Sequence, residues 1–478
     1  MSTTDTIRSA APYLLSWARA QAAHLRVPGV QLAVRSGDEL VLDEAIGVAD
    51  LSTGEPLRTD HLFRIASHSK TFTATAVMQL VQAGRLRLDD PAGTWVPELA
   101  DGGSPIAAAT VRELLGHQAG VIRDGDHADF WQLAYPFPDR EALLAAVLAD
   151  GGATLARNEH FKYSNLGYGL LGLIVEAVSG QGYAEHLREH VTAPLGLTRT
   201  GAELEPERAG EYAAGHTGLL LGEHERQVIE HVDTRALAAA TGFYSTAAEL
   251  TTYGSAHWFG DTRLLDDDSK RLMQRLESVV TSYGTEIGRY GVGIERRTIG
   301  QRELVGHSGG YPGHITRTYV DPREKLVVSV LTNAIDGPAD LIATGIIKLV
   351  DAALNPSSGT TPTPHDDALP PLSSYTGRFA NLWGMLDVAD LGGRLVLVRP
   401  TLADPLQGLE EVTVEGPDLL RVHAQSTFGA GGELVHLERG PDGAVTSVRS
   451  TGMTSWPVEE FRRRRPAMTS TSTPRLAP

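Results

Sequence analysis

A segment rich in Pro, Ser and Thr at residues 355–371 (NPSSGTTPTPHDDALPP) divides this chain into two unequal parts. Such a composition is typical of a semi-rigid linker between domains. Residues 1–354 mix strand-like and helical patterns, whereas residues 372–462 contain strand-like runs only. We therefore predict two domains joined by this linker, followed by a disordered tail at residues 463–478.

Strand-like runs stand at both ends of the first part, and helical patterns stand between them. Period-2 and period-3.6 spacing of apolar residues predicts strands at 30–34, 39–45, 315–320 and 326–331, and helices at 6–25, 67–83, 110–115 and 167–179. Strands at both ends around a helical block favour an α+β domain, an antiparallel sheet flanked by helices.

The second part contains short strand candidates separated by Gly, Asp and Pro. Six of them lie at residues 384–388, 394–399, 411–414, 419–423, 433–438 and 445–450, and weaker candidates bring the number to eight. Short, evenly spaced strands of this kind predict a small antiparallel barrel or sandwich.

Composition excludes several classes of function. The 478 residues include no Cys, which excludes disulfide scaffolds, thiolate metal sites, iron–sulfur clusters and a cysteine nucleophile. The net charge of −17 argues against nonspecific binding to nucleic acid or to an anionic membrane. The basic run at residues 462–465 is interpreted as part of a solvated terminus. Residues 1–9 do not resemble a signal peptide, so we expect a cytoplasmic protein.

The first motif that indicates chemistry is Ser-His-Ser-Lys at residues 67–70, at the start of a predicted helix. One helical turn separates Ser67 from Lys70, so their side chains lie on the same side. A serine hydroxyl becomes a nucleophile when a base removes its proton, and a buried lysine with a lowered pKa is such a base. Ser-x-x-Lys alone also occurs by chance in many helices.

The second motif is Tyr-Ser-Asn at residues 163–165, just before another predicted helix. A tyrosine oxygen near the serine and the lysine can carry a proton to a leaving group. The Asn165 amide can hold the lysine and a substrate carbonyl in place. The structural alternative is a turn in which Asn165 caps the helix.

The third motif is His-Ser-Gly-Gly at residues 307–310, on a strand-like segment. Glycine here, as at Gly309, lets a substrate backbone lie against the strand edge, and the Gly310 N–H can complete an oxyanion hole. Tyr311 and His314, which follow, are candidates to line the substrate cleft. The structural alternative is a glycine-rich turn with a surface histidine.

In this order and at these separations, the three motifs resemble the hallmarks of the serine β-lactamase and penicillin-recognising enzyme superfamily. Those hallmarks are Ser-x-x-Lys, then Ser/Tyr-x-Asn, then Lys-Thr-Gly. Residues 110–117, 163–172 and 241–246 look like the same family, and the resemblance covers roughly residues 10–350. It implies a β-lactamase/transpeptidase-like fold for the first domain.

Two departures from these hallmarks indicate which branch of the superfamily the chain resembles. Tyr163 is similar to the class C and D-alanyl-D-alanine carboxypeptidase branch. His307 stands where the family has a lysine, as in D-aminopeptidases, D-amidases and related esterases. Because that lysine helps to bind the β-lactam carboxylate, we expect substrates whose reacting acyl group carries no free carboxylate at this point.

The second domain indicates a smaller group within this branch. A β-lactamase-like domain, a linker, a lipocalin-like barrel and no export signal resemble the penicillin-binding-protein-type thioesterases, the stand-alone cyclases of non-ribosomal peptides of the surugamide and ulleungmycin type. The resemblance implies that the enzyme takes a peptidyl chain from the phosphopantetheine thioester of a peptidyl carrier protein. The peptide's N-terminal amine then attacks the acyl-enzyme, which gives a head-to-tail macrolactam. The acylating residue in this group is usually of D configuration.

The resemblance also implies a role for each site residue: Ser67 as nucleophile, Lys70 as base, Tyr163 as proton shuttle, Asn165 as orienting group, His307 as a group that tunes the field, and the Ser67 and Gly310 amides as the oxyanion hole. An arginine of the barrel reaches the active site in such enzymes, and Arg449 is the best-placed match. The alternative for Arg449 is a solvated arginine on a strand. We expect neither a metal nor another cofactor.

Two further hypotheses remain open. A D-stereospecific amidohydrolase, peptidase or esterase would use the same residues with water as the acceptor. A catalytically silent binding protein of this fold would use none of them. Sequence alone does not separate cyclase from hydrolase, because the difference lies in whether the cleft excludes water while it admits an amine.

Overall fold

The computed structural model describes residues 2–356, 369–423 and 430–468. They form two compact units, residues 26–343 and residues 1–25 together with 344–478. The predicted linker therefore lies largely outside the described residues. Along the described chain, no helix is both long enough and apolar enough to cross a membrane.

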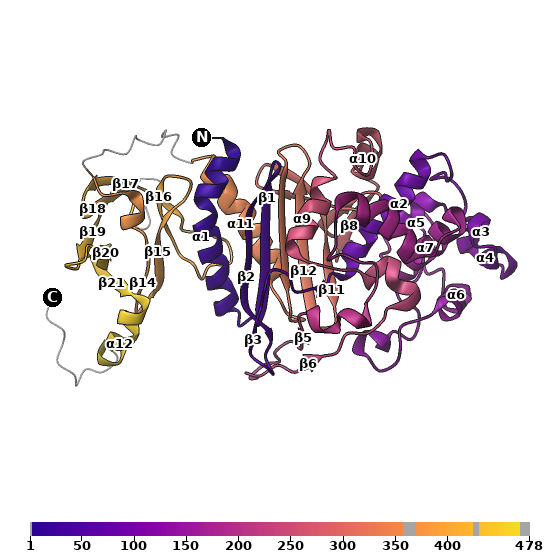
Figure 1. Ribbon diagram of the computed structural model, residues 1–478, viewed down its shortest axis with the longest axis horizontal. Helices are drawn as coiled ribbons and strands as arrows, with labels where there is room; N and C mark the ends of the chain where they lie inside the picture. The colour runs from indigo at the N-terminus through magenta and orange to yellow at the C-terminus, as the bar shows by residue number, and fades with distance from the viewer. Residues whose placement is uncertain (1, 357–368, 424–429, 469–478) are drawn as a thin grey trace. The chain divides into compact units, whose positions relative to one another are not determined.

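Residues 26–343 are built on a nine-stranded sheet in which every neighbouring pair is antiparallel (Figure 1). In spatial order its strands are β3 (Glu55–Pro56), β2 (Glu39–Asp50), β1 (Gly29–Ser36), β13 (Leu326–Thr332), β12 (His314–Asp321), β11 (Arg302–Tyr311), β10 (Glu295–Ile299), β9 (Thr285–Tyr290) and β8 (Ser278–Ser282). β1 pairs with β13, so the two ends of this unit's sequence meet as neighbouring strands inside the sheet. The predicted antiparallel sheet is confirmed.

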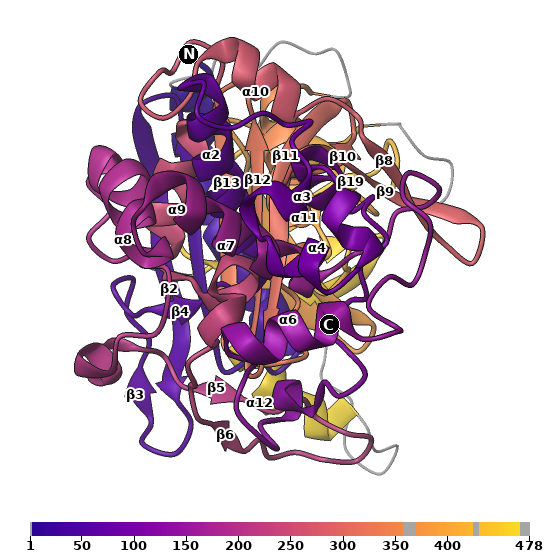
Figure 2. The same ribbon diagram turned by 90° about the vertical axis from the view of Figure 1, so that its right-hand side faces the viewer.

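Helices cover one side of this sheet (Figure 2). The α-helices of this unit are α2 (Ser69–Gln82), α3 (Ala92–Trp95), α4 (Glu98–Asp101), α5 (Val111–Leu115), α6 (Arg140–Leu148), α7 (Asn165–Ser179), α8 (Tyr183–Leu187), α9 (Ala247–Ser255) and α10 (Asp267–Met273). α9 packs on β1, β12 and β13, where Gly254 permits a close approach to Val320 and Val327. α2 and α7 contact each other and share the main apolar core. The short strand pairs are β4 (Phe63–Arg64) with β7 (Tyr244–Ser245), and β5 (Gly215–His216) with β6 (Val228–Ile229).

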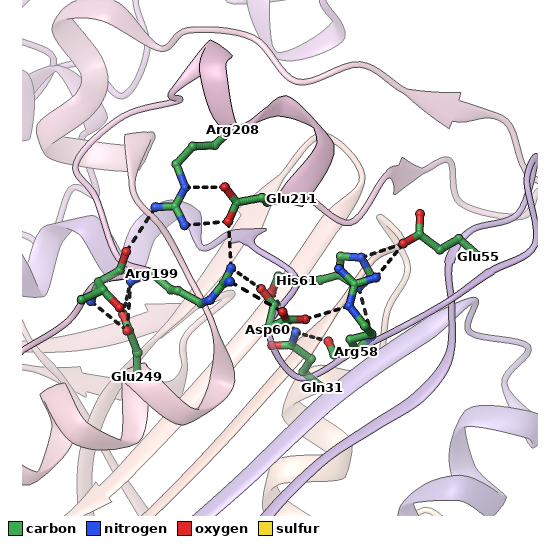
Figure 3. A network of polar contacts seen from close by, with 10 residues as sticks. Gln31, Glu55, Arg58, Asp60, His61, Arg199, Arg208, Glu211 and Glu249 are labelled. Atoms are coloured by element: carbon green, nitrogen blue, oxygen red, sulfur yellow. Dashed lines mark hydrogen bonds and ion pairs between the residues drawn. The ribbon is translucent and has the colours of Figure 1, made fainter.

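A network of polar contacts holds the segment that leads into α2 (Figure 3). The Gln31 side chain, which is buried in β1, donates hydrogen bonds to the carbonyls of Arg58 and His61, each at 2.8 Å. Arg199 donates to the Asp60 carbonyl at 2.8 Å. Since these bonds satisfy backbone groups that have no strand partner, they fix the path of the chain into β4 and the turn that follows.

The other unit contains a closed antiparallel barrel of eight strands, which confirms the predicted lipocalin-like domain. Its strands are β14 (Gly377–Asn381), β15 (Gly384–Asp390), β16 (Leu395–Val398), β17 (Glu410–Gly416), β18 (Leu419–Val422), β19 (Leu434–Arg439), β20 (Val445–Ser450) and β21 (Met453–Pro457). α1 (Thr3–His24) belongs to this unit, because Tyr13 donates to Asp387 at 3.2 Å and Gln21 donates to the Pro400 carbonyl at 2.7 Å. α11 (Ala339–Leu354) crosses from one unit into the other.

The predicted disordered tail needs a correction at its start. α12 (Val458–Met468) extends through the basic run, where Arg462 pairs with Glu459, and Arg463 and Arg464 pair with Glu460. Such pairs at i,i+3 and i,i+4 spacing stabilise a helix. Residues 469–478 lie outside the described part of the chain.

Candidate active site

Ser67 lies in a short 3-10 turn (Ala66–His68) that runs directly into α2. The preceding residue, Ala66, has φ +49°, a strained conformation for a residue with a side chain, and one that is frequent at functional sites. Ser69 stabilises the turn: its hydroxyl donates to the Ala66 carbonyl at 2.6 Å and accepts from the Phe243 N–H at 3.0 Å. Ser67 is partly exposed while both of its neighbours are buried.

Lys70 is fully buried one turn after Ser67, and its Nζ lies 3.2 Å from the Ser67 Oγ. Burial lowers the pKa of Lys70 well below its ordinary value. Nζ also contacts two carbonyl oxygens, Asn165 Oδ1 at 2.8 Å and Ala240 O at 2.9 Å. Carbonyl oxygens only accept, so they take both N–H groups of a neutral amine and leave its lone pair directed at the Ser67 hydroxyl.

Tyr163 donates a hydrogen bond from its hydroxyl to Ser67 Oγ at 2.8 Å. Burial raises the pKa of Tyr163, so the phenol keeps its proton near neutral pH. The ring lies 4.6 Å from the Lys70 Nζ, and His117 packs on it with ring centroids 4.4 Å apart. Tyr163, Ser67 and Lys70 therefore form a continuous path along which a proton can move.

Asn165 is the first residue of α7, and its amide is held from both ends. Its Oδ1 accepts from Lys70, and its Nδ2 donates to Asp124 Oδ1 at 2.7 Å. A carboxylate only accepts hydrogen bonds, so Asp124 determines which way the amide faces. The alternative of an Asn165 cap is wrong: Ser164 caps α7, with its Oγ accepting from the Gly167 N–H at 2.9 Å.

His307 lies on β11 and is buried. Its Nε2 lies 3.0 Å from the Tyr290 hydroxyl, and its Nδ1 lies 2.6 Å from the Ser308 carbonyl, which requires a proton on Nδ1. Burial lowers the pKa of His307 to about 4. The residue at the position of the family's lysine is therefore uncharged near neutral pH.

β11 has a free edge beside this histidine. β10 begins at Glu295, which pairs with Gly306. Among the described residues, 307–311 therefore have a strand partner only on the side of β12. A Cβ on Gly309 would lie 2.2 Å from the Ile65 carbonyl, so only glycine allows β11 to approach the turn that carries Ser67. Gly310 is exposed and has no such constraint.

Three further residues were predicted to bind substrate. Tyr311 and His314 are buried instead of lining the cleft: the Tyr311 hydroxyl donates to the Val232 carbonyl at 3.1 Å, and the His314 Nδ1 accepts from the Arg64 N–H at 3.0 Å. Arg449 is exposed on β20 of the other unit, and its role at the active site stays a prediction.

Sequence reasoning missed an ion pair next to the third motif. Glu295 Oε1 accepts from the Ser308 hydroxyl at 3.1 Å, and its other oxygen pairs with Arg317, which is buried on β12. Burial opposes ionisation of Glu295, but Arg317 outweighs it and lowers the pKa of this carboxyl to about 2. Asp124 and Tyr290 were missed as well. None of these residues belongs to a motif, and only the register of β10, β11 and β12 brings Glu295 and Arg317 together.

Comparison with known proteins places this geometry in a family. Penicillin-binding protein 4* of Bacillus subtilis (strain 168) is 29% identical over 312 residues, which cover 63% of this chain and 67% of the relative. A crystal structure of SurE is 26% identical with a TM-score of 0.58, and the match covers 95% of this chain and 99% of SurE. D-amino acid amidase from Ochrobactrum anthropi SV3, in complex with D-phenylalanine, is 27% identical with a TM-score of 0.57. That match covers 72% of this chain and 98% of the amidase.

These likenesses confirm the predicted resemblance to the penicillin-binding-protein superfamily and fit its thioesterase branch. The model of the beta-lactamase family matches residues 15–351, a range that includes all three motifs. The chain therefore belongs to the beta-lactamase family of serine enzymes.

Proposed function

We propose that this protein is a thioesterase and peptide cyclase, which takes a peptidyl chain from a carrier-protein thioester and releases it by head-to-tail macrolactamisation. The observation that carries this proposal is the likeness to SurE, which extends over 95% of this chain and therefore includes the barrel. The thioesterase group that this chain resembles has the same two parts, a β-lactamase-like domain and a lipocalin-like barrel. A second SurE structure, with D-Leu, is also 26% identical, which fits an acyl donor that ends in a D residue.

In the acylation step, Ser67 Oγ attacks the thioester carbonyl carbon while Lys70 accepts the hydroxyl proton. The Ser67 and Gly310 amides stabilise the oxyanion. The C–S bond then breaks, and Tyr163 delivers a proton to the thiolate and regains one from Lys70. The 2.8 Å contact between Tyr163 and Ser67 and the 3.2 Å contact between Lys70 and Ser67 support this route.

In the release step, the peptide's own N-terminal amine attacks the ester carbonyl. A C–N bond forms, the C–O bond to Ser67 breaks, and the amine proton returns to Ser67 Oγ through Tyr163 and Lys70. Asn165 keeps Lys70 in place throughout. The neutral His307 supports an acyl donor without a free carboxylate at this point, since it offers no cation to pair with one.

The proposed partner is a peptidyl carrier protein, and the proposed location is the cytoplasm, where such thioesters are formed. The second candidate function is a D-stereospecific amidohydrolase with water as the acceptor. The likeness to D-amino acid amidase supports it, although that likeness covers only 72% of this chain.

The experiment that tests the proposal uses a peptidyl N-acetylcysteamine thioester with a free N-terminus and a C-terminal D residue. The enzyme and Ser67→Ala are incubated with it, and the products are read by mass spectrometry. We expect a product lighter than the linear acid by one water, absent with Ser67→Ala and with the matched C-terminal L-residue peptide. Linear acid alone, from both the thioester and the corresponding D-amide, would establish the hydrolase instead.

A further inference from the structure

Tyr163 lies in a segment that has no regular secondary structure. The structure describes residues 161–164, and they belong to no helix or strand, since α7 begins at Asn165. The hydrogen bonds of a helix or sheet therefore do not fix the phenol, although in the proposed reaction it delivers a proton to the thiolate that leaves beside Ser67. A displacement of about 1 Å in such a group costs about 100-fold in rate. Contacts from another part of the chain have to hold Tyr163 in place.

His117 bonds to the backbone on both sides of Tyr163. Its carbonyl oxygen accepts from the Lys162 N–H at 2.8 Å, and its Nδ1 accepts from the Ser164 N–H at 3.1 Å. One residue thus anchors the chain immediately before and immediately after the phenol. His117 follows the end of α5 and has φ +57°, in the left-handed region that residues with a side chain seldom adopt. Such a conformation costs free energy and persists where the surrounding contacts require it.

The imidazole ring of His117 also packs against the phenol itself. The two ring centroids are 4.4 Å apart, and the ring planes are tilted by 34°. Three further rings surround this histidine, with centroids at 5.4, 5.1 and 5.0 Å: those of Phe161, Tyr168 and Tyr290. His117 is buried among them, so its ring cannot move aside. It therefore limits where the ring of Tyr163 can lie.

Hydrogen bonding determines the tautomer of His117. A backbone N–H only donates, so the Nδ1 that accepts from Ser164 carries a lone pair, and the proton of the neutral ring is on Nε2. Nε2 is buried and has no hydrogen-bond partner among the described residues. An unpaired buried donor destabilises a fold, so stability alone does not explain this histidine. Burial lowers the pKa of His117 well below its ordinary value, and the ring therefore acts by its position and not by its charge.

We propose that His117 is a positioning residue, which holds Tyr163 at the nucleophile through the two backbone bonds and the contact between the rings. This inference rests on the proposed function, in which Tyr163 protonates the leaving group, and adds the residue that keeps it in place. Asn165, which holds the base Lys70, is anchored separately, because its N–H donates to the Arg123 carbonyl at 2.9 Å. Loss of His117 therefore slows the step that needs the proton of Tyr163 and spares the activation of the serine.

The test compares two variants of His117 on two thioesters of the same peptide. Both variants tolerate a positive φ: His117→Gly removes the ring and the acceptor, whereas His117→Asn keeps an acceptor, Oδ1, in the place of Nδ1. One donor is the N-acetylcysteamine thioester, whose alkyl thiolate needs a proton, and the other is the p-nitrothiophenyl thioester, whose thiolate leaves without one. We expect His117→Gly to lower kcat/KM by about 100-fold for the alkyl donor and by less than about 5-fold for the aryl donor. His117→Asn should stay within about 10-fold of the wild type on the alkyl donor.

Two controls separate positioning from a general loss of structure. Labelling of Ser67 by a fluorophosphonate, whose fluoride leaves without a proton, should proceed in His117→Gly at close to the wild-type rate. His257→Gly makes the same change at another buried histidine, which lies against Tyr253 and whose Nε2 likewise has no partner in the described part of the chain. This variant should keep the wild-type ratio of the rates on the two donors.

Equal losses on the two donors in His117→Gly would overturn the inference and leave the proposed thioesterase intact. A loss in His117→Asn as large as that in His117→Gly would overturn it as well, since the acceptor would then not matter. If the wild type reacts with neither thioester, the proposed function fails, and the same variants are compared on an amide and a p-nitrophenyl ester of one D-amino acid. A loss confined to the amide would then support the inference, and equal losses, or no reaction with either, would overturn it.

Discussion

Lys70 and Arg317 are both buried basic side chains at this active site, 0% and 4% exposed, yet their surroundings have opposite consequences. Lys70 contacts a hydroxyl and two carbonyl oxygens, none of which carries a full charge. Arg317 contacts the carboxylate of Glu295 and lies 3.1 Å from that of Asp340. Burial lowers the pKa of Lys70, whereas the carboxylates raise the pKa of Arg317 against the effect of burial.

The difference shows that burial alone does not decide whether a basic group is charged. A charge in a low-dielectric region persists where an opposite charge touches it and is lost where only neutral dipoles surround it. On one side of the site the surroundings of Lys70 favour a neutral amine with a free lone pair. On the other side it keeps a charged pair that ties β10 to β12.

The largest effect on activity is expected when Lys70 is replaced by a basic side chain that stays charged. Lys70→Arg introduces a basic side chain of similar reach that stays charged, because guanidinium does not lose its proton and offers no lone pair to Ser67. We expect acylation to fall by about 10⁴-fold, as in Lys70→Ala. The rate of labelling by a fluorophosphonate measures this, and far-UV circular dichroism checks the fold. Substantial labelling of Lys70→Arg would show that Lys70 acts by its charge and not as a base.

The next effect concerns the charged pair. Glu295→Gln leaves Arg317 buried with only the half-exposed Asp340, and we expect a loss of about 3 kcal/mol in the free energy of unfolding in urea. Glu303→Gln, which removes an exposed carboxylate 3.8 Å from Arg296, is the matched control and should change stability by less than about 0.5 kcal/mol.

The pH dependence of Glu295→Gln follows from the lowered pKa of Glu295. The carboxylate stabilises the fold above its ordinary pKa of 4.5, and this contribution is lost as the pH falls toward the folded-state pKa of about 2. The difference between wild type and variant should therefore be full above pH 4.5 and shrink below it. A difference that is constant down to pH 2 would refute the role of the ion pair.

A smaller effect on activity is expected at Asp124, a carboxylate that acts on Lys70 through its charge and through the Asn165 amide. Its negative charge raises the pKa of Lys70 against burial, and its carboxylate orients the Asn165 amide. Asp124→Asn should therefore shift the acidic limb of kcat/KM to lower pH and reduce the plateau by about 10-fold. Asp126→Asn, an exposed carboxylate two residues away, serves as the control. A shift to higher pH would contradict the sign.

The sequence predicts the parts of this site that lie close together in the chain or repeat a known pattern. The spacing of Ser67 and Lys70 predicts this pair directly, and the resemblance of the motifs to the penicillin-recognising enzymes implies that Tyr163 and Asn165 lie beside it. The alternation of apolar residues likewise predicts the central strands and six of the eight barrel strands.

The remaining parts depend on contacts between distant segments. Asp124 lies in an irregular loop, and its role appears only when α7 brings Asn165 beside it. Glu295 and Arg317 become partners through strand register, which apolar periodicity does not specify. The burial of Tyr311 and His314 escaped prediction for a similar reason: these side chains bond to the backbone of Val232 and Arg64, which come from other parts of the chain.

The smallest change is expected at His307, a third buried basic side chain of this site, whose protonation sharpens the comparison of Lys70 with Arg317. His307 Nδ1 lies 3.6 Å from Glu295, yet the pKa of this histidine is lowered by burial to about 4, and the charge of Glu295 is already balanced by Arg317. In NMR spectra, the His307 ring should therefore remain neutral and protonated on Nδ1 from pH 8 down to about pH 5. Arg317→Gln removes a repelling cation and frees Glu295, so it should raise the pKa of His307. A His307 that titrates near pH 6.5 in the wild type would mean that Glu295 holds a charge on this ring as it does on Arg317.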